Sequence, residues 1–357
     1  MNTTGAASFR ASCQRVSREV TSRYIDPLTQ VWLGAARRIG LRVVRTPDAY
    51  AATDGKGTLA IGDHDLDPDD SLAQMIFHEL CHSLVEGEHS FERPDWGMDN
   101  TGPEHDWREH ACLRTQWVLA GRYGLRRVFA PTTDFRTSFW DRLSDDVLAD
   151  RTERSVVAAI AAVRRADLPP WAPALGEALA ATARIAAAAS AFAASSDGGT
   201  LWREVSVPVV HPTGLPGGVA GSCGACAWRF EQRGVVKCRQ AAQKVDPTWP
   251  GCERFAAALD CQTCGACCRA AYHSVEVSKR DPVVKKHPTY VVDRTTYLEI
   301  IRTGDRCGAL TGGEYTEDGH STRYTCVIYD DRPKTCRDFT LGSEHCLTAR
   351  RRVGLSL

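Results

Sequence analysis

A His-Glu-x-x-His motif lies in the first half of the chain, at His78, Glu79 and His82. The two histidines are four residues apart, so a helix presents both imidazoles on one face to a single ion. A hydrolytic zinc site has three protein ligands and keeps a fourth position for water. Glu79, directly after the first histidine, can reach that water as a general base. We therefore predict zinc at His78 and His82, with Glu79 as the catalytic residue.

The third ligand of such a site must come from another segment of the chain. The metzincin spacing places glycine three and histidine six residues after the second histidine, where this chain has Val85 and Glu88. A carboxylate on a following helix is the alternative, and the predicted helix over residues 103–124 carries Glu109, 27 residues after His82. We expect Glu109 to be the third ligand. Three histidines stay open as substitutes for it: His89, His105 and His110.

The residues before the motif indicate the elements that position it. Apolar residues at helical spacing fill 27–39, and short apolar runs over 41–45 and 58–61 are typical of strands. Asp67 and Pro68 are a suitable N-cap and first-turn pair for the motif helix. This order of helix, strands and His-Glu-x-x-His helix resembles that of gluzincin-type zinc metallopeptidases. The resemblance implies a zincin-like domain that hydrolyses a protein or peptide substrate.

Two alternatives to a working peptidase stay open. The motif can be accidental, with both histidines packed in a core, or a zincin-like domain can keep the site while doing something else. Cys81, inside the motif, and Cys112 occupy positions where small apolar side chains would serve. We interpret both as buried packing thiols.

Charge and cysteine content limit the partners and the compartment. Lys plus Arg and Asp plus Glu both number 44, so charge gives no reason to expect nucleic acid or an anionic membrane as a partner. Residues 1–20 show no signal-peptide pattern, and the alanine-rich stretch 172–194 is too weak for a transmembrane span. We expect a cytoplasmic protein whose thiols stay reduced. Its 15 cysteines then indicate metal ligands, not disulfides.

The first cysteine cluster follows a linker rich in glycine and proline. A Cys-x-x-Cys turn presents two thiolates to one centre, and two further thiols complete four ligands, for structural zinc or for an iron–sulfur cluster. The expected ligands of this module are Cys223, Cys226, Cys238 and Cys252.

The second cluster begins with Cys-x-x-Cys-x-x-Cys-Cys and continues to an Ile-Tyr-x-x-Arg-Pro-x-x-Cys-Arg segment over residues 328–337. Its eight cysteines are Cys261, Cys264, Cys267, Cys268, Cys307, Cys326, Cys336 and Cys346. Over about residues 260–346 the chain resembles the YkgJ-type CxxCxxCC zinc- or iron-chelating family, and a related domain occurs in flagellin lysine N-methylases. The resemblance implies a zinc or iron–sulfur centre such as 4Fe-4S. Eight thiols exceed one tetrahedral site, so they allow two centres or one centre with spare thiols.

We predict an α+β protein with a zincin-like helical and short-sheet domain over 1–195. A linker and four-cysteine module over 196–256 and a YkgJ-type domain over 257–357 follow as small cysteine-rich, metal-stabilised domains. The leading function is a metalloprotein that joins a gluzincin-like zinc site to cysteine centres. One alternative is an iron–sulfur enzyme that modifies a protein side chain, with the zincin-like half binding the substrate. A non-enzymatic metal-sensing or storage protein is another.

Overall fold

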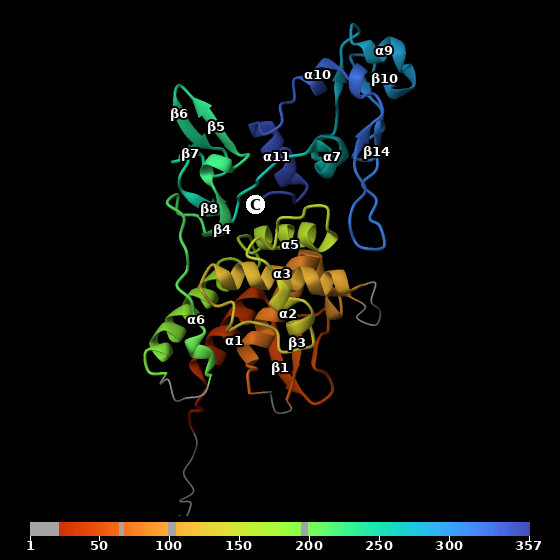
Figure 1. Cartoon of the computed structure of the whole chain (residues 1–357). Coiled ribbons are helices and arrows are strands. Elements are labelled where there is room, and N and C mark those ends of the chain that lie inside the picture. Colours follow the sequence, from red (N-terminus) through yellow and green to blue (C-terminus); the bar gives the residue numbers. More distant parts are fainter. Residues whose placement is uncertain (1–20, 64–67, 99–104, 194–198) are drawn as a thin grey trace, which may run out of the picture.

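The computed structural model describes residues 21–63, 68–98, 105–193 and 199–357, and its architecture is α+β (Figure 1). The predicted N-cap Asp67, the start of the helix expected at 103 and most of the linker after 194 lie outside the described residues. In the described part, every helix is too short or too polar to cross a bilayer.

The first elements form a helix and a small sheet. Helix α1 (Pro27–Ile39) begins after Asp26, whose side chain accepts a 3.0 Å bond from the Thr29 N–H, and ends at Gly40, where φ is 107°. Strands β1 (Arg42–Thr46) and β3 (Thr58–Gly62) pair in parallel, close to the predicted ranges. Strand β2, which the sequence analysis did not predict, adds to β3 as an antiparallel edge and covers Ala51–Thr53.

The motif helix is α2 (Leu72–Glu86). Its N-cap is Ser71, whose hydroxyl accepts a 3.1 Å bond from the Gln74 N–H. The predicted start at Asp67 and Pro68 is therefore wrong, because a serine with extended backbone stands directly before the first helical residue. At the other end, Arg165 donates to the last carbonyls of α2, at 2.6 Å from Leu84 O and 2.9 Å from Val85 O.

Helix α3 (Asp106–Gly121) packs against both α2 and α5 (Arg154–Arg165). Apolar residues recur at nearly helical intervals over 134–165 and predict one helix, but only the second half of this stretch is a long helix. Only a single turn, α4 (Phe135–Ser138), and a short 3-10 segment precede α5. The apolar residues of this stretch contact separate neighbours; Trp140 of the 3-10 segment, for example, packs on Trp117 at 5.0 Å between ring centroids.

A further helix, α6 (Ala174–Ser190), packs on α1 and closes the core of the N-terminal half. Three of the buried aromatic rings of this core contact one another: Trp32 of α1, Phe77 of α2 and Phe129. The ring of Phe77 is 5.2 Å from that of Trp32 and 4.8 Å from that of Phe129. Because Phe77 directly precedes His78, this packing fixes the rotation of α2 and so the direction of the motif side chains.

The cysteine-rich part consists of short elements that lie beyond α5 in Figure 1. The four-cysteine module has two small antiparallel sheets, with strands β4 (Gly217–Ser222), β8 (Pro250–Cys252), β5 (Arg229–Gln232), β6 (Val235–Cys238) and β7 (Gln243–Lys244). The C-terminal part has short helices α7 (Cys261–Cys264), α8 (Ala266–Arg269), α9 (Pro282–Lys286), α10 (Lys334–Arg337) and α11 (Glu344–Arg352). Its strands are β9 (Glu276–Val277), β10 (Val291–Asp293), β11 (Leu298–Ile300), β12 (Arg302–Thr303), β13 (Arg306–Cys307), β14 (Leu310–Thr311) and β15 (Thr325–Cys326).

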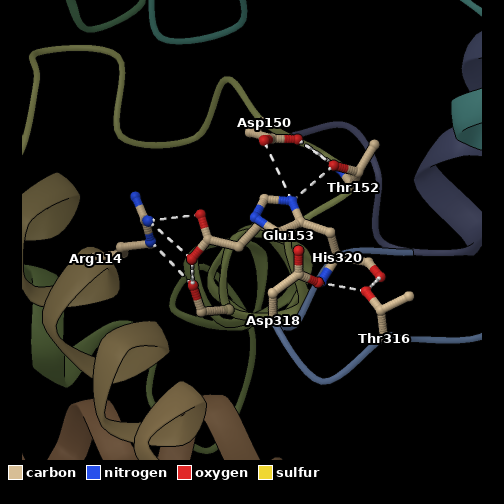
Figure 2. A network of polar contacts seen from close by, with 8 residues as sticks. Arg114, Asp150, Thr152, Glu153, Thr316, Asp318 and His320 are labelled. Atoms are coloured by element: carbon tan, nitrogen blue, oxygen red, sulfur yellow. Dashed lines mark hydrogen bonds and ion pairs between the residues drawn. The ribbon is translucent and has the colours of Figure 1, made fainter. Parts of the chain in front are cut away.

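The loop between β14 and β15 belongs to the cysteine-rich part and contacts the N-terminal half of the molecule (Figure 2). His320 at its tip lies 3.1 Å from the Thr152 hydroxyl and 3.5 Å from an Asp150 oxygen, through Nδ1. The adjacent Glu153 accepts two bonds, of 2.9 and 2.8 Å, from Arg114 of α3. The cysteine-rich part therefore contacts a network that ends on α3, the helix that carries Glu109.

Candidate metal centres

His78 and His82 lie side by side on α2, and their rings meet edge to face with centroids 4.6 Å apart. The two Nε2 atoms are 3.0 Å from each other. The side chain of His82 is 7% exposed and that of His78 is 26% exposed. The pair is therefore anchored in the protein on one side and open to solvent on the other, as a site that admits a substrate requires.

Glu109 of α3 reaches both rings. Its Oε2 is 3.2 Å from His82 Nε2, and its Oε1 is 3.7 Å from His78 Nε2. Burial disfavours the charged carboxylate, but the imidazoles of His78 and His82 outweigh this and lower the pKa of Glu109 to about 2. Burial likewise disfavours charge on His82, yet the carboxylate of Glu109 raises its pKa overall. The three side chains predicted as ligands thus converge on one point.

Gln116 orients the first histidine, a role that the sequence analysis did not assign. Its Oε1 is 2.9 Å from His78 Nδ1, and its amide nitrogen donates to the Phe129 carbonyl. Because the amide nitrogen is engaged in that second bond, Oε1 must be the acceptor, and Nδ1 of His78 carries the proton. Nε2 of His78 consequently presents a lone pair toward His82 and Glu109.

Cys112 is an alternative to Glu109 as the third metal ligand. Its sulfur lies within 4.8 Å of one ring nitrogen of His78 and one of His82, which also lie within that distance of each other. Its sulfur is 3.7 Å from His78 Nδ1 and 3.5 Å from the His78 carbonyl oxygen, to which it donates. Burial, with a further contribution from the Cys81 thiol, raises the pKa of Cys112 well above its usual range. We favour Glu109 over Cys112, because a protonated thiol beside Nδ1 is on the wrong side of the His78 ring.

Glu79 accepts a 2.8 Å hydrogen bond from the Trp96 indole through Oε2. Trp96 is buried with φ at 58°, in the left-handed region that few tryptophans adopt. Thr53 of edge strand β2 holds it there: the Thr53 N–H donates to Asp95 at 3.0 Å, and the Trp96 N–H donates to the Thr53 hydroxyl at 3.2 Å. The sheet edge thereby orients the carboxylate of Glu79.

The three histidines considered as substitutes for Glu109 have other surroundings. His89 is exposed, in the 3-10 segment Glu88–Glu92. His105 is the N-cap residue of α3. The ring of His110 stacks on Phe139, with centroids 4.0 Å apart and an angle of 4° between the planes.

The donor set of the first site suits zinc. Two imidazole Nε2 atoms and one carboxylate are a recurrent set in hydrolytic zinc sites. The two Nε2 atoms and the Glu109 oxygens face one another at 3.0 to 3.7 Å, an arrangement that a shared cation stabilises. His82 Nδ1, by contrast, is buried without a hydrogen-bond partner among the described residues. The second ring nitrogen of a metal-bound histidine usually donates to an acceptor, so His78 fits this rule and His82 does not.

The cysteines of the four-cysteine module surround one hollow, which Cys223, Cys226, Cys238 and Cys252 all line. Cys223 and Cys226 flank the turn after β4. Cys238 is the last residue of β6, and Cys252 is the last residue of β8. Burial raises the pKa of Cys252 to about 11, and the nearby thiols of Cys238, Cys226 and Cys223 add to this. All four are free cysteines. The structure therefore brings the four predicted ligands of this module together.

Six of the eight C-terminal cysteines divide into two groups. Burial raises the pKa of Cys261 to about 11, and the thiols of Cys267, Cys264 and Cys346 raise it further. Burial raises that of Cys336 to about 12, helped by the thiols of Cys307, Cys267 and Cys326. Charges act strongly only over short distances. One group therefore contains Cys261, Cys264 and Cys346, and the other contains Cys307, Cys326 and Cys336.

Cys267 and Cys268 lie between these groups on the short helix α8, with their sulfurs 3.7 Å apart. Helix α8 contacts α11, which carries Cys346, and β13, which carries Cys307. Cys267 packs with the apolar residues around Cys264, and Cys268 packs with those around Cys307. The left-handed Gly265, with φ of 58°, turns the chain between α7 and α8, where a Cβ would meet the Tyr324 ring at 2.8 Å.

Several thiols accept a hydrogen bond from the backbone N–H two residues later. Such bonds favour the thiolate and lower its pKa, although burial raises it more. The pairs are Cys226 with Trp228, Cys252 with Arg254, Cys307 with Ala309 and Cys326 with Ile328. Arg332 donates to the Tyr329 carbonyl at 2.6 Å, and Arg337 donates to the Arg332 carbonyl at 2.8 Å. The charge of Arg332 also acts to lower the pKa of Cys326 and Cys336.

Spacing distinguishes the cysteine sites from the histidine site. Among the residues that the structure describes, a set of three candidate ligand atoms all within 4.8 Å of one another occurs at His78, His82 and Cys112. No three cysteine sulfurs of the described part meet that limit. Sulfurs bound to one zinc are about 3.8 Å apart, since each Zn–S bond is about 2.3 Å. In the described part, pairs of sulfurs such as Cys267 and Cys268 come as close as 3.7 Å, but no set of three is as compact as the ligands of a single zinc ion.

Comparison with known proteins places one part of the chain in a family. Residues 260–351 match the CxxCxxCC family, described as a "putative zinc- or iron-chelating domain". Searches of curated proteins and of solved structures gave no match. The match confirms the predicted relationship of the C-terminal domain and the expectation of zinc or iron at its cysteines. The resemblance of the N-terminal half to zinc metallopeptidases is not shown by these comparisons.

Proposed function

We propose that the protein is a zinc-dependent hydrolase of peptide bonds whose N-terminal half binds zinc through His78, His82 and Glu109. The observation that carries the proposal is the convergence of three lone-pair donors from α2 and α3, next to a glutamate that follows the first histidine. The cysteine-rich part supplies separate metal centres.

The chain's own residues have distinct tasks in this proposal. Zinc, when bound, would lower the pKa of a coordinated water toward about 7 and polarise a substrate carbonyl. Glu79 takes the proton of the attacking water and returns it to the leaving amine. Trp96 keeps one Glu79 oxygen engaged, at 2.8 Å, which leaves the other oxygen for the proton. Gln116 keeps the proton on His78 Nδ1, so that Nε2 stays available to the metal.

We further propose that the eight C-terminal cysteines form two four-thiolate centres. The first comprises Cys261, Cys264, Cys267 and Cys346, and the second comprises Cys268, Cys307, Cys326 and Cys336. The division between Cys267 and Cys268 is supported by their packing against different apolar clusters. The wide sulfur spacing favours iron–sulfur clusters, whose iron atoms lie between the sulfurs, over single zinc ions.

Glu109→Ala tests the first site. We expect zinc affinity to fall by about 10-fold to 100-fold or more, because the variant keeps two of three protein ligands. Zinc bound to the purified full-length chain is measured during titration with a competing chelator.

Asp106→Ala is the matched control, since Asp106 is an exposed carboxylate on the same helix, α3. It should leave zinc affinity unchanged. Equal affinity of Glu109→Ala and wild type would remove Glu109 from the ligand set, and a loss confined to Cys112→Ala would transfer the role to that thiol.

A further inference from the structure

The four-cysteine module lies before residue 260, outside the segment that matches the metal-chelating family, and it contains a histidine that the sequence analysis did not single out. His211 is 2% exposed. It lines the same hollow as the four cysteines, and its Nε2 is 3.3 Å from the sulfur of Cys223. A buried polar side chain directed at a cysteine sulfur requires an explanation, because burial of an imidazole is costly without partners.

The hydrogen bonds of His211 define which nitrogen carries its proton. The backbone N–H of Thr213 donates to Nδ1 at 3.1 Å, and the Thr213 hydroxyl lies 2.6 Å from the same atom. A backbone N–H is only a donor, so Nδ1 is the acceptor and Nε2 carries the hydrogen. Nε2 therefore has no lone pair for a metal, and its hydrogen faces the Cys223 sulfur at 3.3 Å and the backbone carbonyl of Pro250. Such a donor stabilises a thiolate and suits a sulfur that is bound to a metal.

The backbone of the module is shaped for the same purpose. The N–H groups of Trp228 and Arg254 reach the sulfurs of Cys226 and Cys252. Gly224 lets the Cys-x-x-Cys turn approach the Pro247 carbonyl, which a Cβ would meet at 2.8 Å. Donors directed at several sulfurs compensate the charge of thiolates, whereas protonated thiols would need no such donors.

We propose that Cys223, Cys226, Cys238 and Cys252 ligate a third, independent iron–sulfur cluster, and that His211 donates an N–H···S hydrogen bond to the Cys223 thiolate without binding iron. No three of these sulfurs lie within 4.8 Å of one another, which supports a cluster over a single ion. The histidine stabilises the thiolate-bound, reduced form of the cluster, since hydrogen bonds to cysteine sulfur offset negative charge.

Two variants of the full-length chain, purified without oxygen, test the ligand set. Cys238→Ala/Cys252→Ala should lower iron and acid-labile sulfide together, by one third of the cluster content of the wild type if the C-terminal domain holds two clusters. Cys112→Ala, which removes a cysteine outside the module, should change neither. Loss of zinc without iron would overturn the cluster assignment, and unchanged metal content would overturn the site as a whole.

His211→Ala tests the role of the histidine. We expect the variant to retain its iron and sulfide, to lose iron to a chelator about 10-fold to 100-fold faster, and to shift the reduction potential of one cluster downward. His211→Gln, which can still donate an N–H, should restore part of the shift. His273→Ala is the control, because that side chain is 85% exposed. Loss of the cluster in His211→Ala would make the histidine a ligand, and an unchanged potential and release rate would exclude the hydrogen bond.

Discussion

Glu79→Gln is expected to reduce peptide hydrolysis by about 10²-fold to 10⁴-fold, the range for loss of a general base, while zinc stays bound. The amide cannot accept the proton of the attacking water, but it has nearly the shape of the carboxylate and can still accept the Trp96 bond. Hydrolysis is measured with a library of internally quenched peptides, and bound zinc is measured in the same samples.

Glu88→Gln is the matched control, because Glu88 is an exposed glutamate shortly after the motif helix. It should keep the activity of the wild type. Activity that persists in Glu79→Gln at the wild-type rate would assign hydrolysis to another group or to a contaminant. Zinc lost along with activity would instead show that the variant had damaged the site.

Replacement of single C-terminal cysteines is also expected to have a large effect, the loss of one of the two proposed metal centres. Cys346→Ala should remove the first centre and Cys326→Ala the second, so each variant loses about half of the metal bound by residues 260–351. The two losses should add in the double variant, because the centres have no ligand in common. Iron, zinc and sulfide are counted in the full-length chain with the module cysteines intact.

Cys112→Ala again serves as the control and should retain the metal of both centres. Loss of all metal of the domain in either single variant would contradict the division, provided that circular dichroism shows the fold to be intact. Retention of all metal in one variant would identify the replaced cysteine as a packing thiol.

Local spacing predicted much of the N-terminal arrangement. The four-residue interval between His78 and His82, and the position of Glu109 on a following helix, depend on helix geometry alone, and the structure places the three side chains together. The metal at this point stays a prediction. Gln116 and Trp96 could not be assigned in this way, because their contacts with the motif depend on how α3 and the edge of the sheet pack against α2.

The elements that were predicted wrongly or missed also depend on tertiary packing or are too short to leave a pattern in the sequence. Residues 139–153 have apolar side chains at nearly helical intervals, yet Trp140 packs on α3 from a short 3-10 segment, so tertiary packing determines the structure there. Strand β2 is only three residues long, too short for a clear alternation of apolar and polar side chains. The grouping of the cysteines depends on contacts between α8, α11 and β13, which no local pattern reveals. The Cys-x-x-Cys-x-x-Cys-Cys motif predicted a metal domain, but not its division.

A count of zinc, iron and acid-labile sulfide in the full-length chain, purified without oxygen, tests the central claim most directly, namely that histidine and cysteine sites hold different metals. Carboxylate and imidazole favour zinc, and widely spaced thiolates favour iron–sulfur clusters. We predict one zinc per chain that His78→Ala/His82→Ala removes, together with iron and sulfide that this variant retains. A colourless protein without iron or sulfide, or zinc content unchanged by the variant, would contradict the account.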